Sequence, residues 1–336
     1  MQKKETDRIW LATLAALLTV AAVGTAGALN QVGETFPGFL LLGNRVVASV
    51  GLPSWPGTEG GEVFQHQVIA MDSVPVTSAA AIRAHVRTLP AGTPIEYRMR
   101  SRDREIVKTI ETRNFSWRDF GQLYGLYLAN GISIGFAALV AIRRRRNSAA
   151  RACAPLLLVS ALWVLTALEL YSPNLMFRFH ALCEAMLFPV ALVMALGFPS
   201  RSAYLIRYPW LPSALYGAGA CLALAYQVFL YHAADYTAIH LTALSAFGLS
   251  LLMLVVGQVE RLRRPLSAAA RERLKVVALG AVVALSVPIA FTLAETLTGG
   301  SSPQNALALT GGIFPLALSY ALLSGGDASR PRRRLV

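Results

Sequence analysis

The sequence predicts a membrane protein in which eight spanning helices form a bundle and one small α+β domain is inserted between the first two helices. Three observations predict this fold class. The 336 residues are 55% hydrophobic and 15% charged, whereas soluble domains are about one quarter charged. Apolar runs of spanning length recur along the chain, and short basic clusters separate many of them. One stretch, residues 31–120, lacks such runs and mixes charges of both signs.

A helix of about twenty apolar residues can cross a hydrocarbon core that is roughly 30 Å thick. Runs of this kind lie near residues 9–29, 121–142, 152–171, 175–198, 209–231, 237–258, 276–297 and 304–324. The first run follows a short basic segment, so a signal peptide cleaved near Ala28 is the alternative reading. Because the run is long enough to span a bilayer unaided, we expect a retained helix.

Basic residues predict the orientation of the bundle. They lie before the first run, after the second, fourth and sixth runs, and after the last: Lys3, Lys4, Arg8, residues 143–146, Arg151, Arg201, Arg207, Arg261, Arg263, Arg264, Arg271, Arg273, Lys275, Arg330 and residues 332–334. The connections on the other side, residues 172–174, 233–236 and 298–303, contain no Lys or Arg. Since short cytoplasmic loops are rich in Lys and Arg, both termini are expected in the cytoplasm of a bacterial cell, with the chain in the inner membrane.

The spans define the expected domains. Residues 1–30 form the cytoplasmic amino terminus and the first helix, and residues 31–120 form a periplasmic domain. Residues 121–324 form a seven-helix membrane domain, and residues 325–336 form a basic cytoplasmic tail. The net charge of +13 is explained by this topology, so nucleic acid is not expected as a partner, whereas membrane lipids are.

Residues 31–120 alternate apolar and polar residues, as Ile95, Tyr97 and Met99 do, which is typical of strands. We expect a helix that begins at a Thr77 or Ser78 cap and ends near Leu89. The expected strands are residues 45–50, 67–71, 74–76, 95–100 and 106–112, with a tight turn at residues 72–73 and a charged turn at residues 101–104.

This order of elements, and the segment GEVFQHQVIAMDSVPV at residues 61–76, resemble a bacterial PDZ domain. In that family, a loop after a Gly and an apolar residue offers backbone N–H groups to a peptide carboxylate. The resemblance implies that Gly38, Phe39 and Leu40 form this loop, beside the helix that bears Ile82, His85 and Val86. The alternative is a domain that folds without binding peptide.

One helix, an outer PDZ-like domain and seven more helices that end near residues 315–323 (PLALSYALL) together resemble the membrane input half of sensor histidine kinases of the competence quorum-sensing type. In that family the last helix continues into a cytoplasmic kinase. Here only a short basic segment follows Leu323, with no phosphoacceptor or ATP-binding region. The resemblance therefore implies a sensor without kinase activity of its own, either as a stand-alone protein or as a truncated kinase.

Motifs of membrane enzymes are absent from the sequence. It contains no His-Glu-x-x-His pair, no Gly-x-Ser-x-Gly elbow and no Asp-rich prenyl-phosphate motif, so we expect no enzyme activity. The cysteines Cys153, Cys183 and Cys221 have no paired spacing, so neither a metal nor a cofactor is expected.

Polar residues within the predicted helices lie in the outer halves, whereas the inner halves lack ionisable residues. A charge in hydrocarbon costs roughly 2.5–3.5 kcal/mol, so such residues usually face a cavity or one another. We expect an outward-opening pocket whose candidate ligand-binding residues are Glu184, His180, Glu169, Arg178 and Gln227. His180 and Glu184 are one turn apart and share a face, whereas Arg178 points elsewhere. The alternative, interfacial anchoring, is expected for Glu169, His232, His240 and Glu295.

These features predict a receptor that binds a peptide or a small ligand outside the cell and relays binding to a cytoplasmic kinase or another output protein. The alternatives are a transporter or lipid-handling protein that uses the same pocket, and a PDZ scaffold without signalling. Gly121-x-x-x-Gly125 and Gly131-x-x-x-Gly135 permit close helix packing, so a homodimer is a further expectation.

Overall fold

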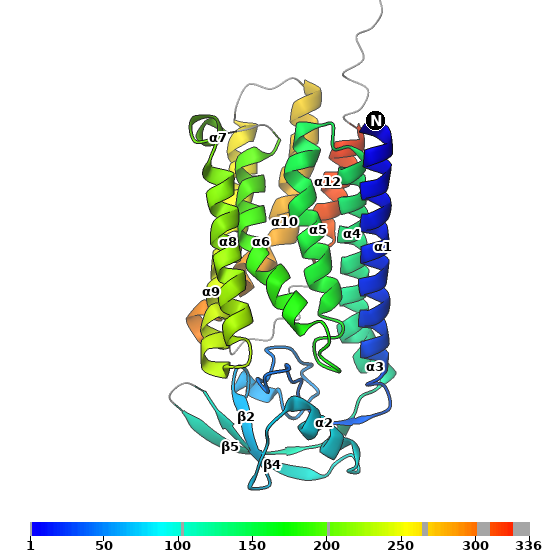
Figure 1. Cartoon of the computed structure of the whole chain (residues 1–336), viewed down its shortest axis with the longest axis vertical. Helices are drawn as coiled ribbons and strands as arrows, with labels where there is room; N and C mark the ends of the chain where they lie inside the picture. Colours follow the sequence, from blue (N-terminus) through cyan, green and yellow to red (C-terminus); the bar gives the residue numbers. More distant parts are fainter. Residues whose placement is uncertain (1, 102–103, 200–201, 264–267, 301–309, 325–336) are drawn as a thin grey trace, which may run out of the picture.

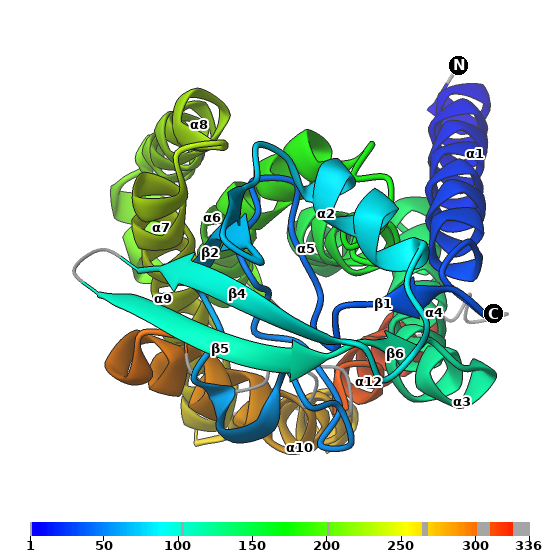
Figure 2. The same cartoon turned by 90° about the horizontal axis from the view of Figure 1, so that it is seen from below.

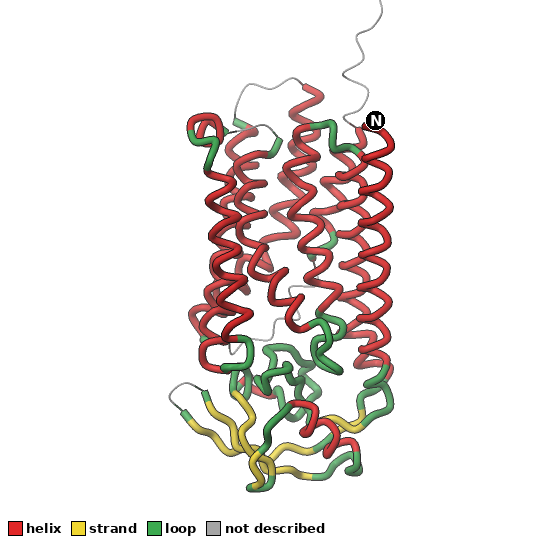
Figure 3. The backbone as a smooth tube through the Cα atoms, in the orientation of Figure 1, coloured by secondary structure: helices red, strands yellow, loops and turns green. Residues whose placement is uncertain are grey.

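The computed structural model describes residues 2–101, 104–199, 202–263, 268–300 and 310–324, and it places a small sheet region at one end of a long helical bundle (Figure 1). The sheet region, residues 30–116, contains the described strands, and the bundle contains most of the helices (Figure 3). Seen along the bundle axis, strands β4 and β5 cross the end of the bundle (Figure 2). The two parts are therefore stacked along one axis.

Seven described helices are long and apolar enough to cross a membrane. Six are α1 (Gln2–Leu29), α5 (Ser148–Thr166), α6 (Phe177–Gly197), α8 (Leu211–Phe229), α9 (Ala233–Leu262) and α10 (Ala268–Thr298). The other runs through α3 (Trp117–Phe120), the π-helical turn η2 (Gly121–Gly125) and α4 (Leu126–Arg143). These helices confirm a multi-pass membrane protein and match the first seven predicted runs, because hydropathy over twenty residues is a local property of the sequence.

The eighth predicted span, residues 304–324, lies partly outside the described residues. Its described part is α12 (Ile313–Ser324), a shorter apolar helix that packs against α4 and α10. The predicted basic tail, residues 325–336, lies outside the described residues.

Helix α4 packs between α1 and α5, and small residues bring these helices close together. A Cβ added to Gly131 would lie 2.5 Å from Leu165 Cδ2, and one added to Gly135 would lie 3.4 Å from Leu17 Cδ1. These two glycines, expected to permit dimerisation, therefore face α5 and α1 of the same chain. A homodimer stays a prediction.

The main sheet has four strands in the order β3-β2-β4-β5, and all neighbouring strands are antiparallel. The strands are β2 (Gln67–Met71), β3 (Val74–Pro75), β4 (Pro94–Arg100) and β5 (Glu105–Glu111), and a separate pair joins β1 (Thr35–Phe36) to β6 (Arg113–Asn114). Helix α2 (Ala79–Arg87) begins at Ser78, whose hydroxyl accepts from Ala81 N at 3.1 Å. The remaining short elements are the 3₁₀ turn η1 (Glu59–Gly61) and α7 (Ala203–Arg207).

One face of the sheet forms a core of its own. In β4 the side chains of Ile95, Tyr97 and Met99 are buried and those between them are exposed, as the alternation predicts. They pack against Ile82 and Val86 of α2. The turn between β2 and β3 places Asp72 and Ser73 at positive φ, which is the conformation that a two-residue hairpin requires.

The strand predicted at residues 45–50 is not formed as a continuous strand. Only two isolated bridges occur there, Leu41 to Val47 and Val46 to Gln67. Arg45 lies at a φ of 67°, which interrupts extended pairing. The segment instead makes a tight loop whose backbone bonds run to residues 40–42 on one side and residues 65–68 on the other.

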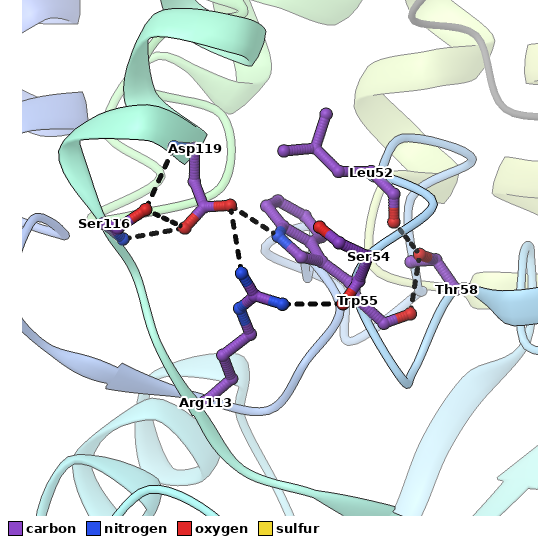
Figure 4. A network of polar contacts seen from close by, with 7 residues as sticks. All are labelled: Leu52, Ser54, Trp55, Thr58, Arg113, Ser116 and Asp119. Carbon is purple, nitrogen blue, oxygen red and sulfur yellow. Dashed lines mark hydrogen bonds and ion pairs between the residues drawn. The ribbon is translucent and has the colours of Figure 1, made fainter.

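A polar network joins the sheet region to the start of the second span (Figure 4). The buried Asp119 accepts from Trp55 Nε1 at 3.0 Å and from Ser116 N at 2.8 Å and Ser116 Oγ at 2.6 Å. Arg113 lies 3.7 Å from the same carboxylate and donates to Ser54 O at 2.6 Å. Because the Asp119 carboxylate of α3 accepts from donors of the sheet region, this network fixes the sheet region to α3.

Candidate functional site

The candidate site is a cavity of about 90 Å³ that lies between the sheet region and the bundle, and it is called the chamber below. Helices α4, α5, α6 and α9 form its walls. The loop at residues 42–50 of the sheet region, which lines the cavity through Leu42 and residues 48–50, forms its roof together with Gln65. A water needs roughly 10–15 Å³ of such space, so the chamber has room for several waters or a small ligand.

Glu184 of α6 is the most connected polar residue of the chamber, and only 3% of it is exposed. Its Oε1 accepts a hydrogen bond from the Tyr226 hydroxyl of α8 and lies 2.7 Å from His240 Nδ1 of α9. Its Oε2 lies 3.4 Å from Trp163 Nε1 of α5 and 3.8 Å from His180 Nε2. One carboxylate therefore links four helices.

Each imidazole in this cluster also stacks on an aromatic ring. The His180 ring lies over Trp163 with centroids 5.8 Å apart, and the His240 ring lies nearly parallel to Tyr236 at 5.7 Å. The other nitrogen of His180, Nδ1, lies 2.9 Å from Thr166 Oγ1. These contacts fix the orientation of both rings toward Glu184.

The roof is tied to the bundle by hydrogen bonds at its edges. Ser49 Oγ donates to Gly300 O at 2.5 Å and accepts from Gln65 Nε2 at 2.8 Å. Asn44 Nδ2 donates to Leu230 O, at the end of α8, at 2.9 Å. Gly43 packs so closely on Phe177 that an added Cβ would lie 2.9 Å from the ring. The roof is thus in contact with the ends of the helices that face the sheet region.

Of the predicted pocket residues, the structure brings Glu184 and His180 together in the chamber, at the predicted one-turn spacing. Arg178 and Gln227 lie outside it. Arg178 NH1 donates to Gln227 Oε1 at 3.2 Å, and this pair joins α6 to α8 on an exposed face. The prediction that Arg178 points away from His180 is consistent with this placement.

Glu169 is buried but does not line the chamber. Its carboxylate accepts from Leu175 N at 2.6 Å and Met176 N at 2.8 Å, just before α6 begins. Burial raises the pKa of Glu169, although these two N–H donors and Arg83 act to lower the pKa. Its observed contacts are those of a residue that shapes the connection between α5 and α6.

The predicted peptide loop lies beside α2, as the resemblance implies. Gly38 has a φ of 79°, and Phe39 and Leu40 are buried. The cavity between this loop and Arg83 of α2 measures about 20 Å³, room for about one water. Gln31 and residues 34–36, which follow α1, line the same cavity, so a peptide would have to separate these segments. Peptide binding here stays a prediction.

Part of the cluster was not predicted from the sequence. His240 was expected to be an interfacial anchor, but it is 7% exposed and contacts Glu184. Glu295, expected at the interface, is 1% exposed. His240 lies seven residues into α9, as Glu184 does into α6, so equal depth is the signal that would have linked them. Tyr226 and Trp163 gave no such signal, because aromatic residues are common in membrane helices.

Within the described part of the chain, no group of three or more His, Cys, Asp or Glu side chains is arranged to hold a metal ion. Comparison with models of protein families, with curated proteins and with solved structures found no match for this chain. The resemblances to a PDZ domain and to sensor-kinase input halves therefore stay predictions.

Proposed function

We propose that this chain is a transmembrane receptor that binds a ligand in the chamber from the extracytoplasmic side and relays occupancy to a cytoplasmic partner protein. The observation that supports it most directly is that the sheet region and four helices share the chamber wall. A ligand that fills the chamber contacts all of them at once. Its binding energy is therefore available to shift both the roof and the helix packing.

The proposed orientation places the sheet region outside and the opposite end of the bundle in the cytoplasm. Exposed basic residues gather at that opposite end, among them Arg143, Arg144 and Arg263. Arg143 and Arg145 also pair with Asp7 and Glu5 of α1, at 2.7 Å and 3.3 Å. By the positive-inside rule this end faces the cytoplasm, where an output protein such as a kinase would bind.

The cluster around Glu184 gives the proposed relay a physical basis. A ligand that binds the Glu184 carboxylate and displaces it changes the contacts of this carboxylate with α5, α8 and α9 at the same time. Helices are stiff over their length, so a shift at the outer end moves the inner end. The transporter alternative is less well supported, because α6 and α10 continue as helices through Pro189 and Pro288, whereas transporter sites often use interrupted helices.

The test fills the chamber and measures distances at the inner end. Spin labels are attached at Arg144→Cys and Arg263→Cys in a chain whose exposed Cys221 is replaced by Ala. The substitution Ala167→Phe places a ring in the chamber wall. We expect the mean distance between the labels, measured by electron–electron double resonance in nanodiscs, to shift by on the order of 2 Å.

The matched control is Ala218→Phe, on an exposed face of α8. It adds the same ring without entering the chamber, so the distance should stay that of the parent chain. A distance that Ala167→Phe leaves unchanged, in a chain that still melts cooperatively, would show that the chamber is not coupled to the inner end. The receptor proposal would then be wrong.

A further inference from the structure

One oxygen of the Glu184 carboxylate has capacity for a further strong hydrogen bond. Its Oε1 is used by Tyr226 and by His240 Nδ1 at 2.7 Å. The donors nearest Oε2 are Trp163 Nε1 at 3.4 Å and His180 Nε2 at 3.8 Å. Charge-assisted N–H···O bonds are usually about 2.7–2.9 Å long, so both contacts are weak. A ligand donor could therefore bind Oε2 more tightly than either protein group does.

The charges of the chamber favour a cation over an anion. Among the described residues that line it, Glu184 is the acidic side chain, and neither Arg nor Lys is present. The other titratable groups that contact the carboxylate are the two imidazoles and the Tyr226 hydroxyl, and all three already lie against it. Tyr127 and Tyr171 also line the wall, and their ring faces are compatible with an ammonium group.

A second cavity lies deeper in the bundle, on the side away from the roof. This inner cavity has a volume of about 100 Å³, and its wall shares Ile134, Trp163, Val164 and Gly311 with the chamber. The rest of its lining is mainly apolar and includes Leu157, Phe247, Leu285 and Phe314. Trp163 thus lies in the wall between the chamber, which contains the Glu184 carboxylate, and the inner cavity.

We propose that the chamber and the inner cavity together take a small amphiphilic amine. Its ammonium group donates to Glu184 Oε2, and its hydrocarbon chain passes Trp163 into the inner cavity. The proposal rests on the proposed function, because it names the ligand class of the same site. A dry cavity of about 150 Å³ holds a benzene molecule, so the two spaces suit a chain of about six carbons.

The test uses hexylammonium chloride as the probe and the full chain in phosphatidylcholine nanodiscs. Thermal unfolding is followed while the probe is titrated, and an apparent Kd is taken from the shift of the midpoint. We expect a saturable increase in the midpoint with hexylammonium. Hexanol, hexanoate and methylammonium, which lack the charge, invert it or lack the chain, should each give a shift less than half as large.

Two pairs of variants locate the head and the chain of the probe. Glu184→Gln removes the carboxylate and should weaken the apparent affinity by about tenfold or more, the usual loss for a hydrogen bond to a charged group. Glu272→Gln, at an exposed glutamate on α10, should leave the apparent affinity within twofold of that of the parent chain. Ser160→Leu fills part of the inner cavity and should weaken binding, whereas Ser286→Leu on an exposed face should not.

The outcomes separate this inference from the proposed function. Equal shifts with hexylammonium, hexanol and hexanoate would overturn the ligand class, and that comparison needs only the native chain, whatever the folding of the Gln variant. If hexylammonium gave no shift of the midpoint while the spin-label distance still responded to Ala167→Phe, the amine proposal would be wrong and the receptor proposal would be supported. If hexylammonium bound saturably but the spin-label distance did not respond to Ala167→Phe, the amine site would be supported and the relay to the cytoplasmic end would be wrong.

Discussion

At the scale of single residues, buried carboxylates in this chain have different partners and different effects. Glu184 contacts side chains on three other helices around the chamber, whereas Glu169 accepts from backbone N–H groups at the start of α6. Asp119 accepts from an indole and a hydroxyl where the sheet region meets the bundle. The structural role of each carboxylate therefore depends on its donors. The donors of Glu184 on the other helices lie far away in the sequence, whereas the backbone donors of Glu169 lie within seven residues of it.

Replacement of Asp119 by Asn should loosen the junction in Figure 4. An amide has one acceptor oxygen, so either Trp55 Nε1 or the Ser116 donors would lose their partner, and Arg113 would lose its counter-charge. We expect a loss of about 1–3 kcal/mol in the free energy of unfolding, seen as a lower thermal midpoint in nanodiscs.

The control for this prediction is Asp235→Asn at an exposed pair with His232. It should change the midpoint little, because exposed pairs contribute about 0–1 kcal/mol. Equal midpoints for the two variants would mean that the junction network adds nothing to stability.

At the scale of elements, the roof depends on close approach between a loop and a helix end. The loop at residues 42–45 places Gly43 against the Phe177 ring at the first residue of α6. A side chain at this position has no space unless the roof or the ring moves. The close contact between the roof and α6 therefore depends on the absence of a methyl group at Gly43.

The substitution Gly43→Ala should lift the roof from α6. Its Cβ would lie 2.9 Å from Phe177 Cδ1, and such overpacking typically costs about 1–3 kcal/mol. We expect a lower thermal midpoint and faster hydrogen exchange of the amides of residues 42–50. The double variant Gly43→Ala, Phe177→Leu should recover part of both, since the smaller side chain relieves the contact.

Gly121→Ala is the matched control. A Cβ there meets no atom within 4 Å, and alanine favours helices over glycine by about 1 kcal/mol. This variant should be as stable as the parent chain or more stable. If Gly43→Ala behaved in the same way, the roof would not be seated on Phe177.

At the scale of the whole molecule, the sheet region and the basic end lie at opposite ends of the bundle, which predicts the topology directly. Alkaline phosphatase fused after Asn114 should be active, because the proposed orientation exports it. Fusions after Asn147 and after Arg263 should be inactive at similar expression. Activity after Asn147 would reverse the proposed orientation and place the chamber on the cytoplasmic side.

The sequence predicted those parts of the molecule that depend on local patterns. The seven described spans, the Ser78 cap of α2 and the alternation in β4 each follow from residues close together in the chain. The pairing of His180 with Glu184 was predictable for the same reason.

The other features of the fold and the site could not be predicted, because they depend on which faces of the helices and loops pack together. His240 and Glu169 both lie near one end of an apolar run. His240 lines the chamber and contacts Glu184, whereas Glu169 accepts from backbone N–H groups in the connection before α6. Likewise, the segment at residues 45–50 has the composition of a strand but is bent into the roof, where Asn44 and Ser49 bind bundle carbonyl groups. Tertiary contacts decided each of these outcomes.

The contacts between the roof and the bundle also have a consequence for the rate of ligand exchange. An occupant that leaves the chamber past the roof must first open the contacts at Ser49, Asn44 and Gly43. Dissociation is then governed by the opening rate of the protein, which for such motions lies on the microsecond-to-second scale, rather than by affinity alone. The proposed receptor would then average its ligand concentration over the lifetime of these contacts and would not respond to fluctuations shorter than that lifetime.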